Sequence, residues 1–320
     1  MKDNHDAPPY MHPTYHELRH APVYFIKLGE GGKWERECFD NHKLKFGYEA
    51  APRAFAENAK WEDLRRYWIE KEGKNPSVAQ SIVRQTSVFH TASDSAVFVT
   101  FAEGSMLWSR AAATVHWNDD GTTERQAIGG WQSRSISGKP LTTSSLSGEL
   151  LCVQMYRQTI CNVRARDYAI RKITDTPLPE VENAIAAATA MRVALLQLIR
   201  KLGPKDFELL LELIFSTSGW RRLTPIGKSQ RDTDFDLYLP TTQERAFVQV
   251  KSKATQADLQ NSIAVLANSD GYHRLFFVHH TGEVAPPPTH ASRVTLLGPE
   301  RVAEMAMDAG LASWLMDKVF

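Results

Sequence analysis

The sequence predicts an α+β protein of two domains, in which a strand-rich N-terminal domain is joined by a helix to an α/β C-terminal domain. Three observations predict this. The segment Pro177-Leu178-Pro179 separates a Trp-rich region with short β-type runs from a different region downstream. Apolar residues recur at helical spacing from Glu180 to Leu202. Near the C-terminus, two β-type runs flank a short polar break, which is the pattern of a hairpin.

These boundaries predict the organisation of the whole chain. We expect a flexible segment at 1–20, a first domain at 21–176, a helical connector at 177–203 and a second domain at 204–320. At 320 residues, the chain is long enough for two domains that each bury a core. The connector helix is a candidate dimer helix, and the alternative that it is a core helix of the second domain stays open.

Composition excludes several classes of protein. Hydrophobic residues make up 42% and charged residues 23% of the chain, as in globular proteins. Cys38, Cys152 and Cys161 form no CxxC pair, so they cannot build a four-ligand zinc site by themselves. We expect a reducing cytoplasm. No signal sequence and no apolar run of about 18 residues is present, so we expect no contact with a membrane.

The first domain is predicted to be a small β-barrel. A strand from Val23 leads into the Gly-rich turn Gly29 to Gly32 and a helix start at Trp34. Later strands are expected at 44–48, 97–101, 106–108 and 129–131. This order resembles the opening of PUA-like domains of the EVE type.

That resemblance implies a pocket for an extruded base, in which aromatic walls stack on the ring and polar groups read its edge. The candidate aromatic residues are Trp34, Trp108 and Trp131. The alternative that these residues belong to the barrel core stays open, because a buried Trp needs only a partner for its indole N–H.

The second domain alternates helices and strands. Helices are expected from Pro204, at 257–267 and at 299–307, and the strands outside the hairpin are expected at 275–279 and 293–297. A closing segment runs through Trp314. This pattern predicts an α/β sandwich.

The hairpin gathers polar side chains on one face, since residues two apart on a strand share a face. The apolar side chains of its first strand, such as Leu237, point the other way. The polar face would carry Asp234, Asp236, Gln249 and Lys251. If the loop is centred on Thr242 and Gln243, Asp236 lies opposite Gln249 and Asp234 opposite Lys251.

A carboxylate, an amide and an ammonium group on one face can serve phosphodiester hydrolysis. That reaction uses an oxygen-ligated divalent cation and a positive charge near the attacking water. The pattern resembles the PD-(D/E)xK nucleases, and Gln before the Lys resembles their Mrr-like restriction endonuclease branch. The upstream helix with Glu208 and the turn Gly219-Trp220 occupy the places that the family gives to such elements. The Gly-Gly pair that precedes the family's Asp is absent.

The resemblance implies a role for each residue. Asp236 would bind the metal, Gln249 would hold the position of the second acid, Lys251 would be the catalytic lysine, and Glu208 would assist the metal from its helix. Asp234 competes with Asp236, and we favour Asp236 as the better cross-strand match to Gln249. The expected cofactor is Mg²⁺, with Mn²⁺ able to substitute.

The expected function is a DNA endonuclease of restriction or antiviral defence type, whose first domain recognises a feature of double-stranded DNA such as a modified base. The net charge of +1 requires contacts to DNA to come from local basic clusters. The candidate residues for the DNA backbone are Arg221, Arg222, Lys228, Arg231 and Lys253. A homodimer would supply two sites for two strands.

Two alternatives stay open at this point. The first domain could sense a nucleotide signal or a foreign protein and control the nuclease as an effector. The chain could also be a catalytically silent DNA-binding protein, because Gln249 adds no negative charge for an ion.

Overall fold

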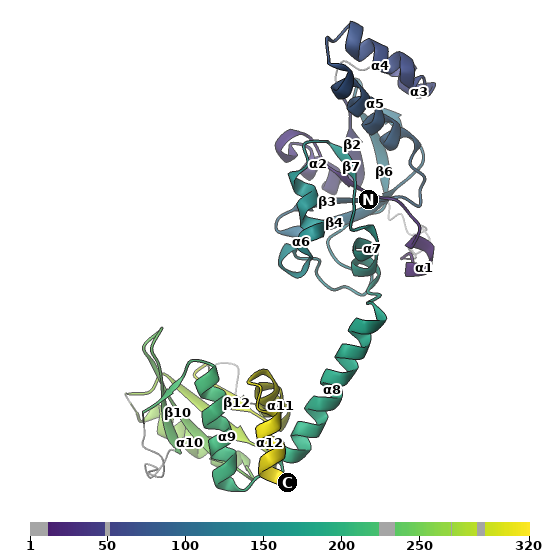
Figure 1. Ribbon diagram of the computed structural model, residues 1–320. Helices are drawn as coiled ribbons and strands as arrows, with labels where there is room; N and C mark the ends of the chain where they lie inside the picture. The colour runs from purple at the N-terminus through teal and green to yellow at the C-terminus, as the bar shows by residue number, and fades with distance from the viewer. Residues whose placement is uncertain (1–11, 49–51, 224–233, 270, 287–291) are drawn as a thin grey trace, which may run out of the picture. The chain divides into compact units, whose positions relative to one another are not determined.

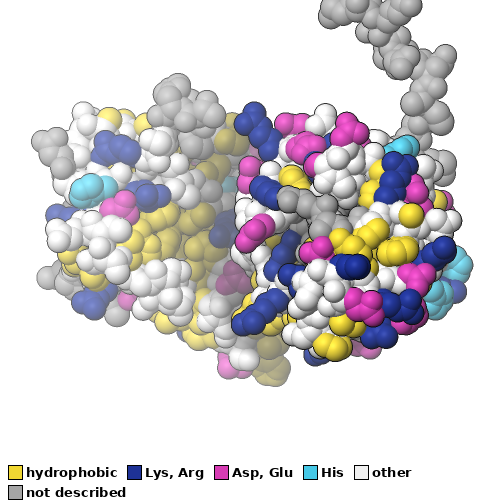
Figure 2. All heavy atoms as spheres, turned by 90° about the horizontal axis from the view of Figure 1, so that it is seen from above, with side chains coloured by type: hydrophobic (Ala, Val, Ile, Leu, Met, Phe, Trp, Pro, Cys, Tyr) yellow, Lys and Arg dark blue, Asp and Glu magenta, His cyan; other side chains and the backbone are white. Residues whose placement is uncertain are grey.

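The structure is a computed structural model, and it describes residues 12–48, 52–223, 234–269, 271–286 and 292–320. The chain divides into two compact units, Met1–Leu178 and Pro179–Phe320 (Figure 1). Each unit has its own sheet and its own hydrophobic core. The charged side chains of both signs are interspersed on the face seen in Figure 2, in keeping with a net charge near zero.

The N-terminal unit is built on one mixed sheet of seven strands. The order is β2-β6-β4-β3-β1-β7, with β5 paired to β6. β1 and β3 are parallel, and the other pairs are antiparallel. The strands are β1 (Val23–Ile26), β2 (Lys43–Phe46), β3 (Val97–Ala102), β4 (Ser105–Ala111), β5 (His116–Trp117), β6 (Thr123–Gln132) and β7 (Ile160–Asn162). The expected strands are therefore present.

This sheet is open rather than a closed barrel. Its edge strands β2 and β7 do not pair with each other within the described residues. Both faces are covered, since Phe25 and Val99 pack with α6 (Gly148–Leu151) and α7 (Arg166–Thr174), whereas Ile26 and Phe98 pack with α2 (Glu35–Asp40) and α5 (Pro76–Thr91). Burial on both faces explains why these strands are almost continuously apolar.

Three helices between β2 and β3 were missed by the sequence analysis. They are α3 (Arg53–Glu57), α4 (Trp61–Glu70) and α5. The Asn75 side chain caps α5 by accepting from the Val78 N–H, and Pro76 occupies the first turn, where it needs no partner for its nitrogen. Within the segment expected to be flexible, Tyr15–Leu18 form the short helix α1, and Leu18 is buried.

Arg125 ties the end of α5 to the sheet. Its side chain is fully buried and donates to four carbonyl oxygens, those of Phe89, Ala92, Ala111 and Ala112, at 2.7–3.2 Å. Two of these carbonyls lie at the C-terminal end of α5, where the helix dipole favours a cation. The guanidinium group is thus satisfied by backbone oxygens.

The C-terminal unit has five strands in the order β12-β11-β10-β9-β8. β10, β11 and β12 are parallel, whereas β8, β9 and β10 are antiparallel. The strands are β8 (Arg221–Arg222), β9 (Phe235–Leu239), β10 (Glu244–Lys251), β11 (Arg274–His279) and β12 (Val294–Leu297). The helices are α8 (Pro179–Ile199), α9 (Pro204–Thr217), α10 (Gln256–Ala267), α11 (Pro299–Asp308) and α12 (Ala312–Val319).

Two hydrophobic layers enclose this sheet. On one face, Leu237, Val248 and Val278 pack with α8, α9, α11 and α12. On the other face, Phe247 and Phe277 pack with α10. The expected α/β sandwich is therefore present, and the polar face of the hairpin is the face that α10 covers.

The hairpin between β9 and β10 is confirmed, but its expected register is wrong by two residues. Leu239 pairs with Glu244, and Phe235 pairs with Val248. The turn therefore consists of residues 240–243 and ends at Gln243 with φ +58°. Continuing this register places Asp234 opposite Gln249, whereas Asp236 pairs with Phe247.

Helix α8 packs in the C-terminal unit through its last turns, where Leu195 and Ile199 are buried. Arg192 donates to Glu304 of α11 at 2.7 Å. By length and composition, α8 is the one helix among the described residues that could cross a membrane, with a mean hydropathy of 1.2 over its most apolar window. Only the last turns of α8 pack in the core, and 11% of that apolar window is buried.

Candidate functional site

Asp234 is fixed at the start of β9 by the strand beside it. Its Oδ2 accepts a hydrogen bond from Gln249 Nε2 at 2.6 Å and another from the Val250 N–H at 2.5 Å. Its own N–H donates to the Val248 carbonyl at 3.1 Å. The Gln249 amide is thereby oriented with its nitrogen toward Asp234, which leaves its carbonyl oxygen for another partner.

Glu208 and Lys251 complete this group. Burial and the nearby Asp234 carboxylate raise the pKa of Glu208. Burial also raises the pKa of Asp234, although the Val250 N–H and the Lys251 ammonium oppose that shift. Three other residues expected at the site, Glu208, Gln249 and Lys251, therefore lie within electrostatic or hydrogen-bond reach of Asp234.

Helix α9 delivers Glu208 because its apolar stripe faces the sheet. Phe207, Leu210 and Ile214 are buried, and Glu208 lies at the margin of that stripe. After α9, Gly219 adopts φ +87° and reverses the chain, so that Trp220 packs edge-on against Phe276 with ring centroids 5.5 Å apart. The Gly-Trp turn thus anchors the end of the helix that carries the acid.

Asp236 lies in a different environment. Its Oδ1 accepts a hydrogen bond from the Tyr272 hydroxyl at 2.6 Å, and its Oδ2 is 4.0 Å from Arg245 Nη2. The side chain is 5% exposed. Burial and the Asp236 carboxylate raise the pKa of Tyr272 to about 12. The cross-strand argument that favoured Asp236 is therefore wrong, because the turn places Asp234 at the position opposite Gln249.

The residues around Asp234 fit a divalent metal ion. Burial raises the pKa of both half-buried carboxyl groups, and the Asp234 carboxylate raises that of Glu208 further, so a divalent cation bound between them would favour their ionised forms. Glu208, Asp234 and the Gln249 carbonyl are all oxygen donors, as hard cations prefer. In the described part of the chain, no three His, Cys, Asp or Glu side chains are grouped so that they could hold a metal ion.

The residues expected to contact the DNA backbone differ in their environments. Arg221 and Lys253 are exposed. Arg222 is half-buried, donates to Glu212 at 2.5 Å and lies 5.0 Å from the ring centroid of Phe235. The last two of these residues, Lys228 and Arg231, lie outside the described residues. Arg222 therefore has a packing role that Arg221 lacks.

The three Trp residues singled out in the N-terminal unit do not form one pocket. Trp108 is 1% exposed and donates to the Arg134 carbonyl at 2.8 Å, so it belongs to the core. Trp131 packs edge-on against Phe39 and donates to the Lys43 carbonyl at 2.9 Å. The expectation that all three line one pocket is wrong for Trp108, and Trp131 does not line the cleft that contains Trp34.

Trp34 does line an open cleft, which we call the aromatic cleft. Its volume is about 700 Å³. The lining residues are Lys33, Trp34, Gly47, Tyr48, Trp68, Glu72, Lys74, Val78, Ser81, Ile82, Gln85, Thr122, Arg157, Gln158 and Thr159. Tyr48 was not singled out from the sequence, because it meets Trp68 only through the packing of α4 against the end of β2.

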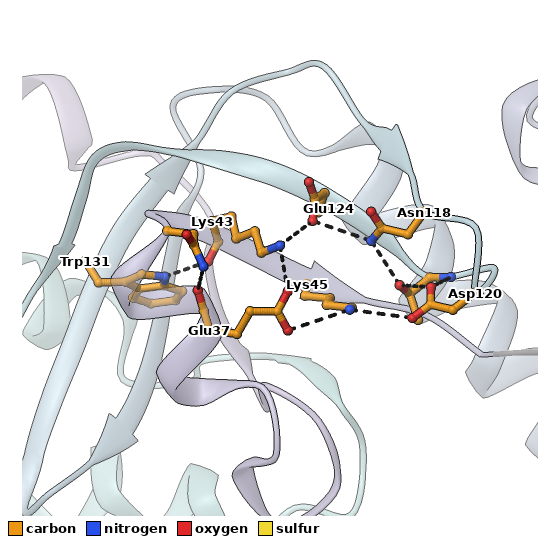
Figure 3. Close-up of polar contacts among 9 residues, drawn as sticks. Glu37, Lys43, Lys45, Asn118, Asp120, Glu124 and Trp131 are labelled. Carbon is orange, nitrogen blue, oxygen red and sulfur yellow. Dashed lines mark hydrogen bonds and ion pairs between the residues drawn. The ribbon is translucent and has the colours of Figure 1, made fainter. Parts of the chain in front are cut away.

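A network of ion pairs stabilises the strand next to this cleft (Figure 3). Lys43 bridges Glu37 at 2.7 Å and Glu124 at 2.8 Å. Lys45 lies between Glu37 and Asp120, and its ammonium is 5.2 Å from the ring centroid of Trp34. The network therefore fixes β2 against α2 and β6 and holds a cation against the Trp34 ring.

The C-terminal unit thus combines a five-stranded mixed sheet with a group of polar side chains around Asp234. Residues 199–305 match the family model of the Mrr catalytic domain, which is a restriction endonuclease domain. The C-terminal unit thus contains an Mrr-type restriction endonuclease domain. No curated protein matches the chain.

Two solved structures are similar to the chain over most of its length. One is the MspJI restriction endonuclease in complex with a 27-mer oligonucleotide, at 11% identity and a TM-score of 0.29, covering 88% of this chain and 75% of that chain. The other is the DNA modification-dependent restriction endonuclease AspBHI, at 13% identity and a TM-score of 0.33, covering 92% and 84%. Similarity at these TM-scores does not establish a shared fold.

Proposed function

We propose that the protein is a metal-dependent endonuclease that hydrolyses phosphodiester bonds of double-stranded DNA, in restriction or antiviral defence. The observation that carries this proposal is the convergence of Glu208, Asp234, Gln249 and Lys251 in a restriction endonuclease domain. Asp234 takes the metal-binding role that the sequence analysis favoured for Asp236. Mg²⁺ is the expected ion, and Mn²⁺ would substitute for it.

Each residue has a distinct part in this proposal. Asp234 and Glu208 would hold the ion, and the Gln249 carbonyl would add a neutral oxygen ligand. The bound ion would polarise the phosphoryl group and lower the pKa of an attacking water. Lys251 would stabilise the hydroxide and the negative charge that develops on the phosphoryl oxygens.

Asp236 would act through packing rather than at the phosphate. Its hydrogen bond from Tyr272 and its proximity to Arg245 join β9 to the segment before β11. This contact would help to keep β9 in register beside β10.

We infer that the N-terminal unit recognises a feature of DNA, such as a modified base, in the manner of a PUA-like module. The open aromatic cleft supports this inference, and the alternative of a nucleotide signal uses the same kind of surface. A homodimer would bring two sites to the two strands of the duplex. All three cysteines are free, which supports a reducing compartment such as the cytoplasm.

Cleavage of plasmid DNA tests the site assignment. We expect the wild-type protein to linearise or degrade a modified plasmid with Mg²⁺, and Asp234→Ala and Lys251→Ala each to lose at least about 100-fold in rate. Tyr272→Phe is the matched control, since it removes the partner of Asp236 and leaves the group around Asp234 intact. Full cutting by Asp234→Ala, combined with loss in Asp236→Asn, would return the metal to Asp236.

A further inference from the structure

Lys251 is held at the end of β10 by the loop that follows it. The Ala254 N–H donates to the Thr281 carbonyl at 2.9 Å, and a Cβ on Gly282, which has φ +98°, would clash with the carbonyl group of Ala254. Only glycine fits at this place without movement of the loop. The turn after β11 therefore fixes the path of the chain from β10 to α10.

The strand beside Lys251 presents a buried ring. Lys251 and His279 are Cα partners on the parallel strands β10 and β11, so their side chains share a face of the sheet. His279 is 5% exposed, its Nδ1–H donates to the Thr281 carbonyl at 3.3 Å, and burial lowers its pKa. A neutral imidazole offers no counter-charge, so the charge that balances Lys251 must come from other elements.

Two carboxyl groups from different elements respond to the charge of Lys251. Asp234 stands at the start of β9, and Asp258 stands in the first turn of α10. The ammonium opposes the rise that burial causes in the pKa of Asp234. It also adds to the fall in the pKa of Asp258, which hydrogen bonds from Thr255 cause in the first place. The Lys251 ammonium is therefore near both carboxylates.

A capping box holds Asp258 in place. Its Oδ2 accepts from the Thr255 N–H at 2.9 Å and from the Thr255 hydroxyl at 2.6 Å, and its own N–H donates to Thr255 Oγ1 at 3.3 Å. Both bonds to the carboxylate end on Oδ2, which leaves Oδ1 for another partner. The start of α10 thus presents a fixed negative charge to the end of β10.

The proposed metal site changes which carboxylate can balance Lys251. Under the proposed function, Asp234 and Glu208 hold a divalent cation, so the charge of Asp234 is engaged by that ion. The ammonium then lies near a cation and near the positive N-terminal end of α10. Asp258 stays outside the ion-binding group, and its charge remains available to Lys251.

We propose that Asp258 is a positioning residue for Lys251. Its carboxylate, fixed by the capping box at the start of α10, holds the ammonium in place beside the proposed metal site when Asp234 binds the ion. This inference rests on the proposed function and adds a residue to its site. Asp258 acts through Lys251 and touches neither the ion nor the DNA.

Two substitutions separate the charge of Asp258 from its role as a cap. Glu and Gln both serve at this position of a capping box, so Asp258→Glu and Asp258→Gln keep α10 capped and differ chiefly in charge. In plasmid cleavage with Mg²⁺, we expect the kcat of Asp258→Gln to fall about tenfold, the equivalent of about 1.4 kcal/mol, with KM for DNA unchanged. Asp258→Glu should keep most of the wild-type rate. A residue that only caps the helix would give the same rate in both variants.

Replacement of Lys251 shows whether Asp258 acts through it. In a Lys251→Met background, Asp258→Gln should cause no further loss of the single-turnover rate. The matched control is Glu17→Gln, which removes the charge from the capping box of Thr14 at the start of α1 and should cut as the wild type does. A wild-type kcat for Asp258→Gln overturns the proposal, and so does an equal loss with and without Lys251.

Thermal unfolding supplies a readout that needs no cleavage. We expect Asp258→Gln to lower the melting midpoint of the C-terminal unit by about 2–4 °C, and by less in the Lys251→Met background. Saturating Mg²⁺ should widen this difference, because Asp234 is then engaged. Additive midpoints with and without Mg²⁺ overturn the proposal. If the wild type cuts no DNA with Mg²⁺ or Mn²⁺ and the midpoints are nevertheless coupled, the proposed function fails while the positioning of Lys251 by Asp258 stands.

Discussion

Replacing Gln249 by Glu would put two carboxylates in contact and so tests the electrostatics around Asp234. In the wild type, Gln249 Nε2 donates to Asp234 Oδ2 at 2.6 Å. Glutamate cannot donate this bond when it is ionised, and it adds a second negative charge at the same place. The pKa of at least one of the two carboxyl groups must then rise, because like charges in contact cannot both ionise freely.

The cost follows from the distance and the exposure. Two unit charges about 4 Å apart repel by about 4 kcal/mol at an effective dielectric constant of about 20. Solvent screening at this half-buried position reduces the repulsion to about 2 kcal/mol. The lost hydrogen bond adds about 1 kcal/mol, so the variant should lose about 3 kcal/mol of unfolding free energy at neutral pH.

The sign of the pH dependence is fixed by the direction of the pKa shift. A carboxyl group whose folded pKa lies above its unfolded value of about 4.3 destabilises the fold as pH rises through that window. The penalty is absent below the unfolded pKa and complete above the folded pKa. A divalent cation bound between the two groups would remove the repulsion, so Mg²⁺ should stabilise the variant more than the wild type.

Thermal unfolding at about pH 5 and about pH 8, with and without Mg²⁺, measures this effect. Without Mg²⁺ at the higher pH, we expect the midpoint of Gln249→Glu to fall by about 5–10 °C, and we expect Mg²⁺ to restore most of it. Gln249→Ala is the matched control, since it loses the hydrogen bond without adding charge and should show no such pH dependence. A Gln249→Glu midpoint that is insensitive to both pH and Mg²⁺ would refute the shared site.

Three further predictions concern other parts of the fold. Arg222→Ala should lower the unfolding free energy by about 1–3 kcal/mol in a denaturant titration, because it breaks the bond to Glu212. Arg221→Ala should leave stability unchanged and should weaken DNA binding, more so at low salt. Arg125→Met should cost at least about 3 kcal/mol, since four carbonyl oxygens lose their donor, and near-wild-type stability would contradict this account. Burial and Arg125 lower the pKa of His90 to about 4, so the N-terminal unit should lose stability as pH falls from about 6.5 toward 4. In an acid titration monitored by Trp fluorescence, His90→Gln should show a weaker dependence of stability on pH over this range.

Strand patterning predicted the C-terminal unit well because its signals are local. Alternation of apolar and polar residues identified β9 and β10, and the same parity placed Gln249 and Lys251 on the polar face. Parity alone could not choose between Asp234 and Asp236, since residues two apart share a face. The choice depended on where the turn closes, and Gln243 with its positive φ was not evident as the last turn residue.

The N-terminal unit was harder to predict because its Trp residues have different roles that depend on tertiary contacts. Trp108 and Trp34 look alike in sequence, yet Trp108 is enclosed between strands and Trp34 lines a cleft. The helices α4 and α5 were not predicted, although Leu64 and Trp68 stand four residues apart and are both buried by α4. The cleft itself forms only when α4 packs beside Tyr48, which no local pattern encodes.

The place where the turn closes decides which aspartate lies opposite Gln249. If two residues were added at the end of β9 and the turn kept four residues, Asp236 would take the place of Asp234, and every apolar side chain of β9 would keep its face because the shift is even. Homologues would then exchange one acid for the other through the length of this strand, with both aspartates and the hydrophobic pattern retained. In an alignment, such an exchange would look like a harmless surface insertion, although it would replace the residue that we propose to bind the metal.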